Sequence, residues 1–275
     1  MTLTLGTGPF GQTPAGVFND AVAVEGRVIW WEDSPRWVRG LLDGETVVDS
    51  RRVKLLHESG LLPRWYFPLS DVRDDLLEAS DRHTHCPIKG DASYFSVRVG
   101  GHVAENAVWT YPEPIEGSPP LQGHLSFELA ALDQWLEEDE PVLGHPRDPY
   151  HRLDVRETSR HVRVSVAGRQ VADSTRAVVL FETGLPPRWY LPREDVDASV
   201  LRPDETTSVC AYKGIASYYT VEVDAHREEA IAWFYPAPER EVSPIVDRIC
   251  FLDEDIDVEI DGEAQERPQT PFSRR

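Results

Sequence analysis

The sequence has little lysine, little cysteine and no long apolar run, and each scarcity excludes something. Of 28 basic residues only Lys54, Lys89 and Lys213 are lysines, and the net charge of −20 opposes nonspecific binding to nucleic acid or to an anionic membrane. No apolar stretch approaches the roughly 18 residues of a membrane-spanning helix, and the first residues lack the pattern of a signal peptide. Three cysteines are too few for a disulfide framework. We therefore expect a cytoplasmic chain with reduced thiols that binds neither nucleic acid nor membrane.

The chain contains an internal repeat. Residues 36–127 match residues 160–251 at a constant offset and without a gap, so that Cys86 falls on Cys210 and Lys89 on Lys213. Each copy is then one structural unit, and 275 residues suffice for two compact domains. We expect an N-terminal extension over residues 1–23, a first repeat domain over 24–138, a linker over 139–155, a second repeat domain over 156–254 and an acidic, polar and largely mobile tail over 255–275.

Alternation of apolar and polar residues predicts that each copy is mainly β. Turn signals at Asp43-Gly44 and Ala167-Gly168 predict matched hairpins. Further strands are expected over residues 64–67, 93–99, 107–111 and 121–127, and at the corresponding positions of the second copy.

Few short helical segments are expected beside these strands. Residues 70–78 and 194–201 have the composition of helical turns, with Ser70 as the N-cap of the first. Residues 129–138 have apolar side chains at helical spacing, which predicts a short amphipathic helix.

The most specific repeated motif is a loop with one cysteine and one lysine, written CPIKGDASY at residues 86–94 and CAYKGIASY at residues 210–218. The glycine permits a positive φ, so we expect a tight loop at a strand end. A chain that otherwise uses arginine keeps lysine here in both copies, which indicates an anion ligand or nucleophile, or else a structural ammonium bound to loop carbonyls. The cysteine is either a reactive thiolate or a buried small apolar residue.

Two further repeated clusters offer candidate ligand contacts. Arg64, Tyr66 and Asp71 would orient a ligand, although the aspartate would equally cap the following turn. Trp109 and Tyr111 share one face of a strand, where they form either a stacking wall or part of the core. The full set of candidate ligand-binding residues is Arg64, Tyr66, Asp71, Cys86, Lys89, Tyr94, Trp109 and Tyr111, with Arg188, Tyr190, Asp195, Cys210, Lys213, Tyr218, Trp233 and Tyr235 in the second copy.

We expect no metal and no cofactor. His83-x-His85-Cys86 has soft ligands, but the second copy has Thr207 and Val209 at the histidine positions. The sequence also lacks a glycine-rich phosphate loop, a G-x-S-x-G elbow and an H-E-x-x-H helix.

The succession Y-x-P-x-x-D-V, C-P-Y-K-G-x-A-x-Y and W-x-Y-x-x-P resembles the bacterial family called domain of unknown function 427, and the resemblance covers both copies. Ile88 replaces the tyrosine of the family's loop in the first copy, and Ala211 replaces its proline in the second. The resemblance implies two tandem, small, curved β-sheet domains of the β-tent or Mss-four-like type. It also carries a nucleotidyltransferase label, although the repeated acids show no close pair for a two-metal site.

Three functions remain open at this point. The leading interpretation is an uncharacterised protein that binds a small anionic or nucleotide-like ligand through the Cys-x-x-Lys-Gly loop. The first alternative is a transferase-like enzyme in which the lysine attacks or stabilises negative charge. The second is a non-catalytic scaffold with structural loops. In each case the two copies are expected to form an internal pseudo-dimer within a monomer.

Overall fold

The computed structural model describes residues 27–270 and residue 273. The described chain divides into two compact units, the first ending at Asp148 and the second beginning at Pro149. Both units are mainly β and contain several antiparallel sheets, which confirms the predicted fold class and the tandem organisation. The likeness to the β-tent arrangement stays a prediction, and the expected N-terminal extension, residues 1–23, lies outside the described residues.

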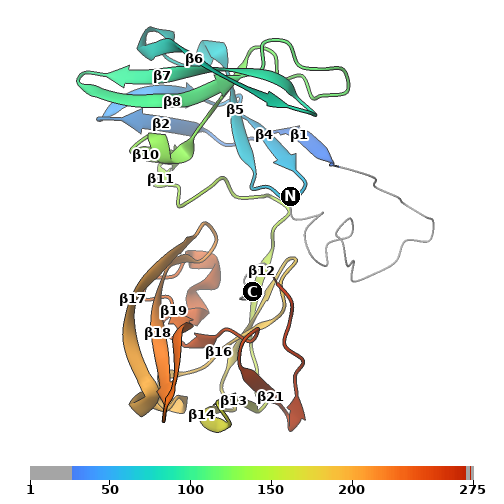
Figure 1. Ribbon diagram of the computed structural model, residues 1–275, viewed down its shortest axis with the longest axis vertical. Helices are drawn as coiled ribbons and strands as arrows, with labels where there is room; N and C mark the ends of the chain where they lie inside the picture. The colour runs from blue at the N-terminus through green and yellow to red at the C-terminus, as the bar shows by residue number, and fades with distance from the viewer. Residues whose placement is uncertain (1–26, 271–272, 274–275) are drawn as a thin grey trace, which may run out of the picture. The chain divides into compact units, whose positions relative to one another are not determined.

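The larger sheet of the first unit has seven strands in the order β1-β4-β5-β9-β8-β7-β6. The strands β6, β7 and β8 form the long ribbon near the top of Figure 1. In chain order the seven strands are β1 (Ile29–Asp33), β4 (Lys54–Glu58), β5 (Arg64–Pro68), β6 (Leu77–Cys86), β7 (Gly90–Val99), β8 (His102–Thr110) and β9 (His124–Phe127).

The smaller sheet of the first unit has the order β11-β10-β2-β3, built from β2 (Val38–Leu42), β3 (Glu45–Ser50), β10 (Gln134–Glu137) and β11 (Glu140–Pro141). Asp43 and Gly44 both have positive φ in the β2–β3 turn, as predicted. The main core contains residues of both sheets, and Trp135 of β10 lies 5.5 Å from Trp65 and 5.9 Å from Phe67 of β5, centroid to centroid. Burial of these rings holds the two sheets together.

The second unit repeats these elements. Its strands are β12 (Leu153–Glu157), β13 (Val162–Val166), β14 (Arg169–Ser174), β15 (Val178–Glu182), β16 (Arg188–Tyr190), β17 (Leu201–Cys210), β18 (Gly214–Val223), β19 (His226–Phe234), β20 (Cys250–Phe251), β21 (Asp257–Ile260) and β22 (Glu263–Ala264). They form sheets of order β12-β15-β16, β14-β13-β21-β22 and β17-β18-β19-β20. The bridge between Leu191 and Ile249 occupies the place of the β5–β9 pairing in the first unit.

Short 3₁₀ turns are the only helical elements of the described residues, which agrees with the expectation of few short helices. They are η2 (Leu69–Asp71), η3 (Asp74–Leu76), η4 (Leu129–Ala131), η5 (Arg193–Asp195), η6 (Ala198–Val200) and η7 (Arg240–Ile245). The expected N-cap was wrong, because Pro68 precedes η2 and Ser70 lies inside it. None of these turns has the length or apolar character that spanning a membrane requires.

The amphipathic helix expected over residues 129–138 was also wrong. This segment forms the turn η4 and then the strand β10, because Trp135 is needed in the core between the sheets. The corresponding segment of the second copy contains β21, which pairs with β13. The expected tail over residues 255–275 therefore begins with strands of the second unit's sheet, not with mobile chain.

Candidate functional site

The Cys-x-x-Lys-Gly loop is a tight turn between two paired strands, as the sequence predicted. The backbone N–H of Lys89 donates to the carbonyl of Cys86 at 3.3 Å. Gly90 has φ +102°, and a Cβ added there would lie 3.2 Å from the carbonyl oxygen of Glu113. The same φ and an equally close carbonyl occur at Gly214. Both the turn and the close backbone approach therefore require glycine.

The lysine of the loop is held in a buried ion pair. Lys89 Nζ donates to Glu58 Oε2 at 2.5 Å, and the lysine side chain is 10% exposed and that of Glu58 4%. Lys213 forms the matching pair with Glu182 at the end of β15. In each repeat the ammonium thus binds a carboxylate at the end of a strand, β4 or β15, that does not pair with the strands of the loop. It donates to neither a loop carbonyl nor, in the described residues, any other acid.

A second side chain donates a hydrogen bond to each carboxylate. Arg27 Nη1 donates to Glu58 at 2.9 Å, and in the second repeat His151 Nε2 donates to Glu182 at 3.0 Å. Burial by itself would raise the pKa of Glu182, but the hydrogen bonds from His151 and Lys213 outweigh burial and lower this pKa to about 2. His151 also stacks on Tyr212, with 4.1 Å between the ring centroids. Glu182 is therefore a buried anion, stabilised by the ammonium group of Lys213 and by the hydrogen bond from His151.

Two phenols lie beside the ion pair of the first repeat. Tyr66 is buried, and its hydroxyl oxygen accepts a long 3.4 Å hydrogen bond from Trp109 Nε1. Burial raises the pKa of Tyr66 to about 12, and burial also raises the pKa of Tyr111. Both phenols are thus neutral at physiological pH and keep their protons for donation to an acceptor.

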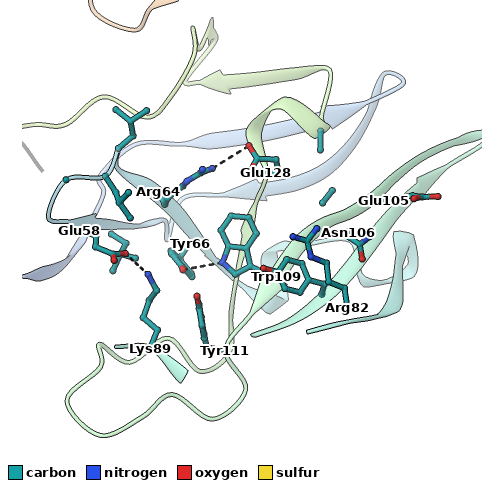
Figure 2. Close-up of a pocket in the computed structure, with 17 residues that line it drawn as sticks. Glu58, Arg64, Tyr66, Arg82, Lys89, Glu105, Asn106, Trp109, Tyr111 and Glu128 are labelled. Atoms are coloured by element: carbon teal, nitrogen blue, oxygen red, sulfur yellow. Dashed lines mark hydrogen bonds and ion pairs between the residues drawn. The ribbon is translucent and has the colours of Figure 1, made fainter. Parts of the chain in front are cut away.

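Lys89, Glu58 and the two phenols line a cavity in the first unit. The cavity has a volume of about 640 Å³, within the range of small-molecule sites. Figure 2 shows the side chains of Lys89, Tyr111, Tyr66 and Trp109 arranged along it, with Arg64 and Glu128 on one side and Arg82 and Asn106 on the other. Leu61 and Leu62, both well exposed, add apolar surface.

Two guanidinium groups lie against the aromatic side chains of the cavity. The guanidinium carbon of Arg64 lies 5.7 Å from the ring centroid of Trp109, and that of Arg82 lies 4.7 Å from the centroid of Tyr94. Arg64 reaches Glu128 only at 3.8 Å, in a pair whose side chains are both more than one-third exposed. Within the described residues Arg82 forms no ion pair with a carboxylate. The cavity therefore presents two guanidinium groups beside planar rings, and its lining also includes the acids Glu58, Glu105 and Glu128.

The structure brings most of the predicted residues of the first copy together. Arg64, Tyr66, Lys89, Tyr94, Trp109 and Tyr111 all line the cavity. Cys86 does not line it and packs, half-buried, against the adjoining apolar cluster. Asp71 also lies outside it. Its carboxylate accepts hydrogen bonds from Ser50 and Arg52 and caps no turn.

The matching residues of the second repeat keep the aromatic arrangement. Trp233 Nε1 donates to the hydroxyl of Tyr190 at 3.3 Å, and Tyr218 and Trp233 have ring centroids 6.4 Å apart, as in the Tyr94–Trp109 pair. Burial raises the pKa of Tyr190 and of Tyr235. Asp195 again bonds a serine and an arginine, Ser174 and Arg176, and so it is placed like Asp71.

Arg188 differs from its counterpart Arg64. Its side chain is 6% exposed, and Nη1 donates to Glu254 at 2.9 Å while Asp253 lies 3.7 Å away. Burial alone would lower the pKa of Arg188, but the hydrogen bond to Glu254 and the nearby acids raise it instead. Burial raises the pKa of Asp253 to about 7. We call Arg188, Asp253 and Glu254 the Arg188 cluster.

Sequence reasoning missed the glutamates and the second arginine. Glu58 and Glu182 are the last residues of two largely buried strands, β4 and β15, at equivalent positions of the repeats. A repeated acid at the end of an apolar strand is the signal that would have paired them with the repeated lysines. Arg82 gave no such signal, because Thr206 replaces it in the second copy.

The described residues contain no group of three or more His, Cys, Asp or Glu arranged to hold a metal ion. His85 instead contacts Asp91 at 2.7 Å, and both side chains are exposed. The site as built consists of cations, carboxylates, phenols and an indole.

Comparison with known proteins identifies a family. A family model described as a domain of unknown function (DUF427) matches residues 30–138 and again residues 154–262. The two matches span most of the chain and coincide with the two structural repeats. A search of curated proteins finds no match.

Proposed function

The chain belongs to the DUF427 family and carries two copies of its domain, and we propose a function for it from the site itself, because the family description specifies no activity. The first repeat binds a small anionic ligand that has a planar part. The ligand would occupy the cavity above the ion pair of Lys89 and Glu58. This proposal keeps the leading interpretation of the sequence and changes the residues that carry it.

The observation that carries the proposal is the placement of Arg64 against the ring of Trp109 and of Arg82 against the ring of Tyr94. Guanidinium groups bind phosphate and carboxylate through planar, bidentate hydrogen bonds. The exposed contact of Arg64 with Glu128 at 3.8 Å contributes at most about 1 kcal/mol, so a ligand anion can replace it. A half-buried indole beside these charges suits a flat ring, which makes a nucleotide-like ligand a good fit.

Lys89 has a supporting role in this proposal. Its charge is already balanced by Glu58, so it adds little net attraction for an anion. The ion pair instead fixes the loop against β4 and positions the phenols of Tyr66 and Tyr111. The hydroxyl groups of these two residues would donate hydrogen bonds to uncharged acceptors of the ligand.

No observation favours the transferase-like alternative over binding. An ammonium group in an ion pair has no lone pair with which to attack an electrophile. The Cys86 thiol lies outside the residues that line the cavity. A cytoplasmic location and a monomeric state stay predictions of the sequence.

Thermal-shift and calorimetric titration test the proposal. The panel comprises nucleoside monophosphates, aromatic carboxylates and inorganic phosphate, each with the wild type and with Arg82→Thr, which introduces the residue of the second repeat. We expect one class of planar anion to raise the melting temperature, and Arg82→Thr to weaken its binding roughly 10- to 100-fold through loss of a charge-assisted hydrogen bond.

Arg98→Thr is the matched control. Arg98 lies on β7, outside the cavity lining, and pairs with Glu78 at 2.7 Å. Its replacement should leave affinity unchanged. Equal loss of binding in both variants would indicate a general charge effect, and absence of binding by every compound would reject the proposed function.

A further inference from the structure

The two repeats place an arginine identically against a tryptophan but leave it in different electrostatic states. The guanidinium carbon of Arg64 lies 5.7 Å from the centroid of Trp109, and that of Arg188 lies 5.8 Å from the centroid of Trp233. The position of the cation is therefore the same in both copies. The two arginines differ in how accessible each one is to an external anion. This difference bears on ligand binding, and the inference drawn from it rests on the proposed function.

Arg188 is already saturated by acids of its own chain. Glu254 occupies both ends of the guanidinium group, with one bond at 2.9 Å and the other at 2.5 Å. The side chain of Glu254 is fully buried and that of Arg188 nearly so. A buried, bidentate pair of this kind has lost its hydration. An incoming anion would therefore have to displace a carboxylate that water cannot solvate in its place.

The acids of the Arg188 cluster come from the segment just beyond the matched part of the repeat. Asp253 and Glu254 occupy the positions of Leu129 and Ala130 in the first repeat. Thr270 adds a hydrogen bond to Glu254 at 2.5 Å, which ties the same carboxylate to the end of the described chain. Hydrogen bonds from Arg188 and Thr270 outweigh burial and lower the pKa of Glu254, so its charge persists at physiological pH.

Two other positions of the cavity lining also differ between the repeats. Thr206 stands where the first repeat has Arg82, and Leu252 stands where it has Glu128. The second repeat therefore lacks the guanidinium group that has no ion-pair partner in the first. Of the two arginines that lie against aromatic rings of the cavity in the first repeat, the second repeat keeps only the counterpart of Arg64, which is Arg188, and its guanidinium group is occupied by acids of the chain.

From this difference we infer that Asp253 and Glu254 confine anion binding to the first repeat, by occupying the arginine that the second repeat would otherwise present to the same class of ligand. The wild-type chain accordingly binds one planar anion. Two residues outside the Cys-x-x-Lys-Gly loop then determine which copy binds.

Reciprocal exchange between the repeats tests this inference. Calorimetry with adenosine monophosphate and phenyl phosphate as probes would compare the wild type with Ala130→Glu, which transfers the blocking acid to the first repeat, and with Asp253→Leu combined with Glu254→Ala and Thr206→Arg, which gives the second repeat the first repeat's residues. Ala130 is exposed, so its replacement should leave the fold intact, and a thermal melt without probe verifies this for each variant.

We expect one site per chain in the wild type, at least a tenfold loss of affinity in Ala130→Glu, and two sites per chain in the triple variant. Where the triple variant fails to fold, Ala130→Glu decides by itself. Two sites in the wild type, or unchanged affinity in a folded Ala130→Glu, would overturn the inference while leaving anion binding intact. Absence of probe binding in the wild type and in both variants would overturn the inference together with the proposed function.

Discussion

The lysine–glutamate ion pair is the same in both repeats, whereas the environment of the arginine beside the tryptophan is not. Lys89 with Glu58 and Lys213 with Glu182 have the same partners, the same burial and the same place at the end of a strand. Arg64 is about one-third exposed, and Arg188 is buried against two acids. The feature common to both copies therefore supports the fold, and the feature that differs determines what each copy presents to a ligand.

The largest expected effect tests the lysine–glutamate ion pairs, which are alike in the two repeats. Glu58→Ala and Glu182→Ala should each lower the free energy of unfolding by about 3–5 kcal/mol, because each change leaves a buried ammonium without its carboxylate. Urea unfolding gives the total loss, and hydrogen exchange assigns it to one unit.

A paired replacement separates the ion pair from mere space filling. Lys89→Met combined with Glu58→Leu should recover most of the stability lost in Glu58→Ala, because no buried charge remains. If one glutamate proved dispensable and the other essential, the two ion pairs would have different roles, and the comparison would break at its firmest point.

Most of the strand pattern could be predicted from the sequence, because alternation directly reflects burial on one face of a sheet. The hairpin turns and the strands that contain Arg64 and Trp109 were expected where they occur. The strand β6 was missed because nearly all of its side chains are at least partly exposed, so its sequence shows no apolar alternation. The helix expected over residues 129–138 was wrong because a turn followed by a strand buries the same apolar residues.

The candidate site could be predicted only in part. The repeat identified the lysine and the aromatic wall, but the partner of the lysine lies 31 residues earlier in the chain, on a strand that does not pair with the strands of the loop, and only the folded unit brings it close. The Arg188 cluster depends on two acids, Asp253 and Glu254, that the first repeat does not have. A comparison of copies selects what both share, so it finds the common support of two sites before it finds what makes them differ.

The second prediction concerns pH and tests the Arg188 cluster, in which the two repeats differ. The pKa of Asp253 is raised by burial to about 7, above its value in an unfolded chain. Its ionisation therefore opposes folding, and stability falls as pH rises from about 4 to 7. Asp253→Leu should raise the free energy of unfolding by up to about 4 kcal/mol at pH 8, and the gain should shrink toward that of simple apolar burial at pH 4.

Thermal melts across this pH range measure the effect. Asp257→Asn serves as the control, because Asp257 is an exposed acid of the same segment paired with Arg267. A gain from Asp253→Leu that is independent of pH would mean that the acid is ionised at little cost beside Arg188. The Arg188 cluster would then be a stable ion triad.

The smallest expected effect concerns the glycines of the two Cys-x-x-Lys-Gly loops, which should affect stability alike and binding differently. Gly90→Ala and Gly214→Ala should each cost about 1–3 kcal/mol, because both glycines have φ +102° and both face a carbonyl oxygen at close range. Gly101→Ala is the control, since its Cβ would meet no atom within 4 Å. The two losses of stability should be equal in urea unfolding. Their effects on binding should not be, because the loop of Gly90 carries Lys89 below the proposed ligand, whereas the second repeat's arginine is blocked. Gly90→Ala should therefore weaken ligand binding and Gly214→Ala should not, and equal weakening by both would show that the second repeat also contributes to the bound state.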